Sequence, residues 1–144
     1  MAEKDNYILD RLGVDIGLKA SHSRTISHED IALFAELSGD FNPIHLNEDY
    51  ARKTPFGGRI AHGVISLGLL SAAMAKLPGI PIFLSQSVRF LKPVRIGDTI
   101  TATAEVIATR KDKGIVTLKN TCTNQNGEIV IEGEASCRLY EPPA

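Results

Sequence analysis

The chain has 144 residues, 43% hydrophobic and 23% charged, a composition typical of one water-soluble globular domain. Its formal net charge is −1, so it lacks the basic excess with which proteins bind a nucleic-acid backbone. Its polar start does not resemble a secretory signal, and its longest apolar stretch is shorter than the ~20 residues that span a bilayer. We therefore expect a single cytoplasmic domain over residues 1–144, with neither nucleic-acid nor membrane partners.

The first part of the chain predicts one strand and one capped helix. Residues 1–19 have scattered apolar positions, which favours an irregular lead-in, and residues 20–27 are compatible with a strand. Ser27 can cap a helix whose third residue, Asp30, completes a capping box. The apolar spacing that follows is helical, and Gly39 suits the end of this helix.

The middle of the chain predicts two further helices separated by a loop. Asn47 can cap a short helix over 48–53, and a proline with paired glycines makes 54–59 a loop. Residues 62–79 predict a helix that stops at a Pro-Gly pair. This helix carries no charge over 63–75, so it has no polar face and is expected to be buried all round.

The rest of the chain predicts antiparallel strands, at 80–94, 98–110, 114–124 and 127–140. In the second segment, the residues expected to face inward are Ile100, Ala102, Ala104, Val106 and Ala108. In the last segment, the residues expected to face inward are Ile129, Ile131, Ala135, Cys137 and Leu139, with Val130 outward. The Asn-Gly pair at 126–127 predicts a tight turn between the last two strands.

That turn also decides how the two cysteines relate. A two-residue turn places Cys122 opposite Ile131 and Cys137 opposite Val116. The two sulfurs are then about 20 Å apart at the rise of a strand, far beyond the ~7 Å limit for a disulfide. Both cysteines are better explained as small buried apolar residues.

These elements predict an α+β architecture. A sheet with alternating polarity buries only one face well, so the simplest way to bury the apolar helix is to curl the sheet around it. The sheet would retain exposed edges, and we therefore expect pairing with a second copy of the chain.

Candidate chemistry begins with Asp40 and His45. Pro43 directs Asn42 toward extended geometry, so the two cannot share one regular helix, but a bent loop can aim both at one point. An Asp and a His that meet at one water molecule can serve as general base and general acid. The alternative is an ordinary loop in which Asp40 or Asn42 only caps backbone groups.

A second candidate is Gly63 at the start of the apolar helix. It has no side chain to block a ligand, and an N–H at a helix N-terminus can stabilise a developing oxyanion. The alternative is that His62 and Gly63 simply begin a helix. No metal site is expected, because the four histidines contain no helical i, i+4 pair and no Cys-x-x-Cys occurs.

Family resemblance joins the two candidates. SGDFNPIHLNEDYA at 38–51, followed by GGRIAHGVISLGLLS at 57–71, resembles the hydratase motif of MaoC-like (R)-specific enoyl-CoA hydratases. SVRFLKPVRIGD at 87–98 is similar to a later segment of that family, and the resemblance covers about residues 12–140. It implies a hot-dog fold, in which an antiparallel sheet wraps a long helix, assembled as a homodimer. No cofactor is implied beyond the coenzyme A of the substrate.

The resemblance also implies roles for individual residues. Asp40 and His45 would hold and activate water, Gly63 would offer its N–H to the thioester oxygen, and Ser71 would support the site. The implied reaction is the reversible addition of water to trans-2-enoyl-CoA, giving (R)-3-hydroxyacyl-CoA. Which member of the Asp40–His45 pair is the base stays open.

Substrate contacts and rival functions also stay open. Asn42 is one candidate contact, and Arg89, Lys92 and Arg95 at a strand end are candidates for the phosphates of coenzyme A. The alternative is that the three cations simply lie at a strand end that is exposed to solvent. Rival functions are an acyl-carrier-protein dehydratase with the same chemistry, a hot-dog acyl-CoA thioesterase and a non-catalytic acyl-CoA-binding domain.

Overall fold

The computed structural model describes residues 7–144. Its helices are α1 (Ile8–Leu12), α2 (His28–Ser38), α3 (Pro43–Leu46), α4 (Glu48–Arg52) and α5 (Gly63–Met74). Its strands are β1 (Lys19–Thr25), β2 (Ile80–Phe90), β3 (Thr99–Arg110), β4 (Ile115–Thr123) and β5 (Ile129–Tyr140). Within residues 7–144, no helix has both the length and the apolar character needed to cross a bilayer.

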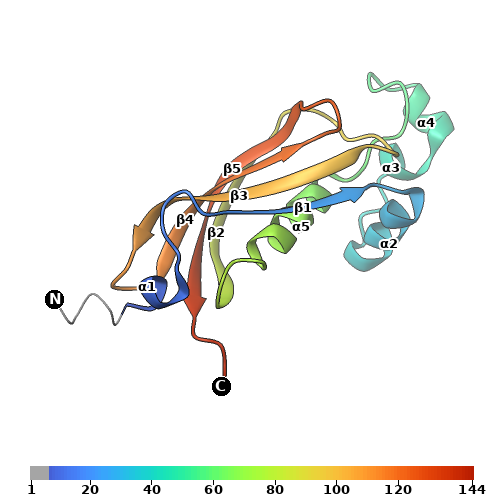
Figure 1. Ribbon diagram of the computed structural model, residues 1–144. Helices are drawn as coiled ribbons and strands as arrows, with labels where there is room; N and C mark the ends of the chain where they lie inside the picture. The colour runs from blue at the N-terminus through green and yellow to red at the C-terminus, as the bar shows by residue number, and fades with distance from the viewer. Residues whose placement is uncertain (1–6) are drawn as a thin grey trace.

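The five strands form one antiparallel sheet of order β1-β3-β4-β5-β2. The sheet bends over α5, while α2, α3 and α4 gather at the end of the sheet where α5 begins (Figure 1). This is the expected α+β arrangement. It places the N-terminus of the apolar helix beside the segment that holds Asp40 and His45.

Helix α5 is buried on one side only. Its buried residues are Ser66, Leu69, Leu70, Ala73 and Met74. Its opposite face, which is exposed, carries Val64, Gly68, Ser71 and Ala75 at helical spacing. The expectation that this helix is buried all round is therefore wrong for the single chain, because the sheet covers only one of its faces.

The apolar helix is also shorter than the expected 62–79. After Met74 the backbone bonds tighten, with Lys76 N–H bonded to the Ala73 carbonyl at 3.1 Å and Leu77 N–H to the Met74 carbonyl at 3.1 Å. Pro78 follows directly and disfavours helical geometry at the residue before it. The chain therefore turns before the Pro-Gly pair.

The predicted pairing of β4 with β5 is confirmed, although the turn that joins the two strands differs from the predicted one. Cys122 pairs with Ile131 and Cys137 with Val116, and both cysteines are free and buried. The loop is one residue longer than expected, because Asn124 N–H bonds to the Glu128 carbonyl at 3.0 Å.

A β-bulge takes up that extra residue. Cys122 pairs with Ile131 whereas Thr123 pairs with Ile129, which leaves Val130 as the extra residue of β5. The bulge turns Val130 inward, with 0% exposure, and Ile129 outward, with 42% exposure. The expected directions of these two side chains are therefore wrong, whereas Ile131, Ala135, Cys137 and Leu139 face inward as expected.

A second β-bulge changes which residues of β3 face the core. Val106 pairs with Leu118 and Ala108 with Thr117, so Ile107 is the extra residue. Beyond this point the alternation changes, and Ala108 is exposed rather than buried.

Two short helices replace expected irregular segments. Helix α1 lies in the predicted lead-in, whose residues 1–6 fall outside the described range, and its Leu9 is fully buried in the core. Helix α3 lies where a loop was expected. The capping box of Ser27 and Asp30 on α2, the Gly39 cap and the Asn47 cap of α4 are confirmed.

Candidate functional site

Asp40 follows directly after the end of α2. Gly39 closes that helix in the left-handed region, at φ +80°, which glycine adopts without strain. The chain then turns sharply, and Asn42 N–H donates to Asp40 Oδ1 at 3.2 Å. The Asp40 carboxylate therefore lies on an exposed turn directly after α2.

His45 is held by the four-residue helix α3. Asn42 caps this helix by accepting from Ile44 N–H at 3.2 Å, and Pro43 occupies its first position, where a missing N–H costs nothing. Asn42 is non-helical, as expected before a proline, and lies near the polyproline II region at φ −54° and ψ 123°. His45 itself is largely buried and bonds through Nδ1 to the Ile60 carbonyl at 2.8 Å.

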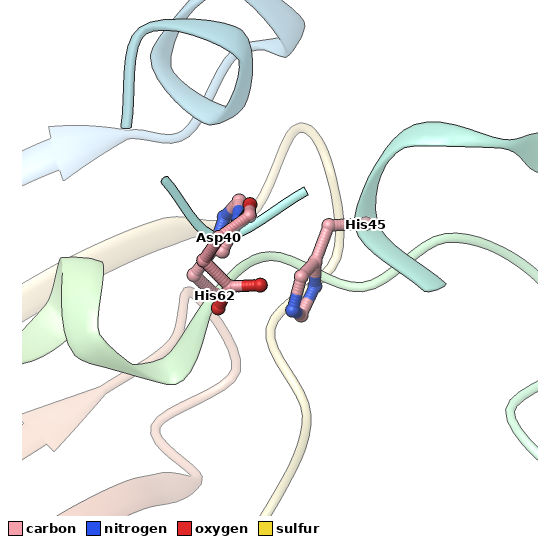
Figure 2. A group of neighbouring side chains, drawn as sticks. All are labelled: Asp40, His45 and His62. Atoms are coloured by element: carbon pink, nitrogen blue, oxygen red, sulfur yellow. The ribbon is translucent and has the colours of Figure 1, made fainter. Parts of the chain in front are cut away.

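The turn and the short helix bring Asp40 and His45 together. Figure 2 shows the Asp40 carboxylate directed toward the His45 imidazole, with His62 beside Asp40. One potential ligand atom from each of the three side chains lies within 4.8 Å of the others. That spacing suits one bound water molecule, and it is also geometrically compatible with a metal ion, which the absence of a helical histidine pair had argued against.

The environment of His45 favours its neutral form. Burial lowers the pKa of His45 below the ordinary 6.5, and this effect exceeds the opposing hydrogen bond to Ile60. Because the Ile60 carbonyl can only accept, Nδ1 carries the proton of the neutral ring. The other nitrogen, Nε2, is then an unprotonated acceptor.

Gly63 lies at the start of α5, where its N–H has no acceptor within the helix. His45 and Gly63 line the same cavity, which has a volume of about 460 Å³. Its other lining residues are mostly apolar: Phe56, Ile60, Ala61, Val64, Phe90, Leu91, Lys92, Pro93, Val94 and Ile131. The arrangement suits an apolar ligand with one polar oxygen at the helix N-terminus.

Ser71 lies further along α5, eight residues or about 12 Å beyond Gly63 at the rise of a helix. It lines a second cavity of about 490 Å³ together with Phe34, Val64, Leu67, Gly68 and residues 83–86. Val64 lines both cavities, so Ser71 lies in a neighbouring cavity rather than beside the Asp40–His45 pair.

The three candidate cations do not converge. Lys92 lines the cavity beside Gly63 and forms an ion pair with Glu128. Arg95 donates to the carbonyls of Phe56 at 2.6 Å and Gly58 at 3.1 Å, which ties down the loop over 54–59. Arg89 instead lines a separate depression with Lys119 and Glu132.

One member of the site was missed in the sequence. His62 was assigned only the start of a helix, yet its ring is buried between Phe34 and His45. The available signal was its position next to Gly63 inside the motif.

Comparisons with known proteins agree with this geometry. The family described as MaoC like domain matches residues 13–126. An (R)-specific enoyl-CoA hydratase of Rhodospirillum rubrum is 52% identical over 122 residues, which cover 83% of this chain and 84% of that protein.

Two solved structures are also similar. The (R)-hydratase from A. caviae involved in PHA biosynthesis has a TM-score of 0.84 and 38% identity, over 88% of this chain and 98% of that one. An R-hydratase from Pseudomonas aeruginosa in the unliganded form has a TM-score of 0.83 and 40% identity, over 90% and 84%. These likenesses confirm the expected hot-dog fold. The chain belongs to the MaoC-like domain family.

Proposed function

We propose that the chain is a hydro-lyase that adds water reversibly to trans-2-enoyl-CoA, giving (R)-3-hydroxyacyl-CoA. The observation that carries this proposal is the meeting of Asp40 and His45, with potential ligand atoms within 4.8 Å, beside an apolar cavity lined by Gly63. The similar proteins named as (R)-hydratases support the same reaction.

The proposed mechanism assigns one task to each group. The thioester oxygen accepts from Gly63 N–H, and a water molecule lies between the Asp40 carboxylate and His45 Nε2. His45 takes a proton as the hydroxyl adds to the β-carbon, and the Asp40–His45 pair returns one proton to the α-carbon. The negative charge that develops on the thioester oxygen is stabilised by the start of α5.

Crotonyl-CoA tests the proposal. Loss of the enoyl absorbance without release of free thiol supports hydration, whereas thiol release identifies a thioesterase. Only an (R)-specific 3-hydroxyacyl-CoA dehydrogenase should oxidise the product. Binding without any conversion would identify a non-catalytic acyl-CoA-binding domain, and a parallel assay with the acyl-carrier-protein thioester decides the carrier.

Asp40→Asn and His45→Gln should each lower kcat by about 10²-fold or more, because each removes a group that handles the water. Both variants should retain the wild-type circular dichroism spectrum. Near-wild-type turnover in either variant contradicts the assigned roles.

We further propose that the chain acts as a homodimer. The exposed face of α5 shares a cavity with Phe83 and Leu84 of β2. Strand β2 is an edge strand of the sheet, and its exposed apolar residues include Ile82, Phe83 and Leu84. An apolar helix face beside an unpaired edge is the surface that a second copy would cover.

Light scattering tests this assembly. The wild-type chain should have the mass of a dimer, and Leu84→Glu should have the mass of a monomer. Leu84 is the extra residue of a β-bulge in β2, between Phe83 and Ser85. Ile107→Glu is the matched control, because Ile107 is also an exposed bulge residue but lies on β3, away from this face.

The remaining proposals concern substrate contacts, cofactor and location. Of the candidate cations, Lys92 is the one we assign to the phosphates of coenzyme A, because it lines the cavity.

The reaction needs no cofactor, since Gly63 N–H rather than a metal ion stabilises the oxyanion, so dialysis against EDTA should leave turnover unchanged. A loss restored by one divalent metal would contradict this. The proposed location is the cytoplasm, which cell fractionation tests.

A further inference from the structure

His62 is enclosed between the two segments that carry the water-handling pair. Its side chain is 2% exposed. Its ring centre lies 4.7 Å from that of Phe34 on α2 and 3.9 Å from that of His45 on α3, with an angle of 32° between the two imidazoles. His62 therefore packs directly against the ring proposed to take the proton.

His62 also forms a hydrogen bond to the backbone of Asp40. Its Nε2 lies 3.0 Å from the Asp40 carbonyl oxygen, which can only accept, so Nε2 carries the proton. The other ring nitrogen, Nδ1, is buried without a hydrogen-bond partner in the described part of the chain. An unpaired buried nitrogen is costly, and an apolar side chain would fill the same space without that cost. The bond to Asp40 is the interaction that requires a hydrogen-bond donor at this position.

That bond is the long-range anchor of Asp40. The other hydrogen bonds of Asp40 within residues 7–144 are local, from its N–H to Ser38 Oγ at 3.1 Å and from Asn42 N–H to its carboxylate. Neither local bond fixes the turn relative to α5. His62 does so, because it is the residue directly before the helix that begins at Gly63.

We propose that His62 is a positioning residue for the Asp40–His45 pair. Its Nε2–H fixes the Asp40 peptide relative to the start of α5. This bond keeps the carboxylate within reach of the water molecule that it is proposed to share with His45. The proposal rests on the proposed hydratase function, in which a misplacement of about 1 Å can cost 10²-fold in rate.

Two conservative variants separate the positioning bond from simple packing. In His62→Gln the amide nitrogen can reach the place of Nε2 and donate to Asp40, whereas in His62→Asn it ends near Nδ1 and cannot. We expect His62→Gln to retain kcat within about 5-fold of wild type. We expect His62→Asn to lower kcat by about 30-fold or more while KM changes less than about 3-fold.

A double-mutant comparison adds a second readout. If His62 acts through Asp40, His62→Asn should lower the residual kcat of Asp40→Asn by less than about 3-fold. Equal kcat in the Gln and Asn variants, or a full additional loss on the Asp40→Asn background, would overturn the proposal. A loss of kcat that follows the loss of thermal stability across both variants would do the same.

NMR distinguishes this failure from a failure of the proposed function. The imidazole nitrogen signals of His62 should show a protonated Nε2, and the amide signals of residues 40–42 should move in His62→Asn but stay in place in His62→Gln. This result supports the hydrogen bond from His62 to Asp40 even if the wild-type chain does not hydrate crotonyl-CoA. An unprotonated Nε2, or equal movement of the amide signals in both variants, overturns it independently of activity.

Discussion

A β-carbon added to Gly63 would lie 2.7 Å from two ring carbons of Phe90, closer than non-bonded carbons approach. Gly63→Ala should therefore destabilise the protein by about 1 kcal/mol or less, because the Phe90 ring must move but is 55% exposed rather than held in the core. It should also lower kcat/KM by about 10²-fold, since the new methyl group lies beside the N–H that is proposed to donate to the thioester oxygen. Urea unfolding and steady-state kinetics measure the two effects.

Gly63→Ala/Phe90→Ala separates these effects. Removal of the Phe90 ring relieves the collision, so the double variant should show less destabilisation by the Gly63 change than the single variant does. Its kcat/KM should stay below that of Phe90→Ala alone. If Gly63→Ala costs no activity on the Phe90→Ala background, the role of the Gly63 amide is refuted.

Burial lowers the pKa of His45 below 6.5, and this sets the pH dependence of the reaction. The proposed base is the neutral ring, so kcat/KM should fall only when the pH drops through this lowered pKa. The acid limb of the pH profile should accordingly lie below pH 6.5. A limb at or above that value would contradict a neutral, buried His45. In His45→Gln the residual activity should lose this limb.

The ion pair between Arg24 and Asp30 should stabilise the start of α2. Arg24 donates twice to Asp30, at 2.6 and 2.9 Å, and the pair holds the pKa of that carboxyl at about 2 rather than 3.8. Asp30→Ala should lower the free energy of unfolding by about 1–2 kcal/mol at neutral pH, because it removes both the ion pair and the capping box. Arg24→Ala, which leaves the capping box intact, should cost less.

The pH dependence of this loss has a definite sign. The folded-state pKa is depressed, so the contribution of Asp30 is complete above 3.8 and is lost as the pH falls toward 2. The difference between wild type and Asp30→Ala in urea unfolding should shrink over that interval. A difference that stays constant would show that the charge of Asp30 is unimportant.

The two cysteines should be unreactive in the folded protein. Burial raises the pKa of the Cys122 thiol to about 12 and also raises that of Cys137, so neither forms the reactive thiolate near neutral pH. Intact mass spectrometry after iodoacetamide treatment should show no adduct under native conditions and two adducts in guanidinium chloride. Labelling of the native protein at the unfolded rate would contradict their burial.

The sequence predicts best what local interactions or alternation decide. The capping box at Ser27 and Asp30 and the glycine after α2 follow from residues within one turn of helix. The pairing of Cys122 with Ile131 also follows, because the bulge and the longer loop cancel. Local patterns of this kind can be recognised in the sequence without knowledge of the tertiary structure.

The missed features depend on tertiary contacts. Helix α1 is too short to be stable alone and forms where Leu9 packs into the core. The bulges at Ile107 and Val130 insert one residue without any residue type that marks them. The motif predicted Asp40 and His45. The burial of His62 depends on how α2 and α3 pack against the start of α5, and the spacing of residues in the sequence does not show this packing.

The bulge at Val130 has a consequence for the cavity some distance from the hairpin. The Val130 carbonyl accepts from Leu91 N–H at 2.9 Å and Lys92 N–H at 3.4 Å, and both donors belong to the cavity wall. The path of that wall is thus determined by one extra residue on a neighbouring strand. A gain or loss of this residue would change the size of the cavity without any change in Asp40, His45 or Gly63, so under the proposed function the substrate range can depend on strand length as well as on side-chain volume.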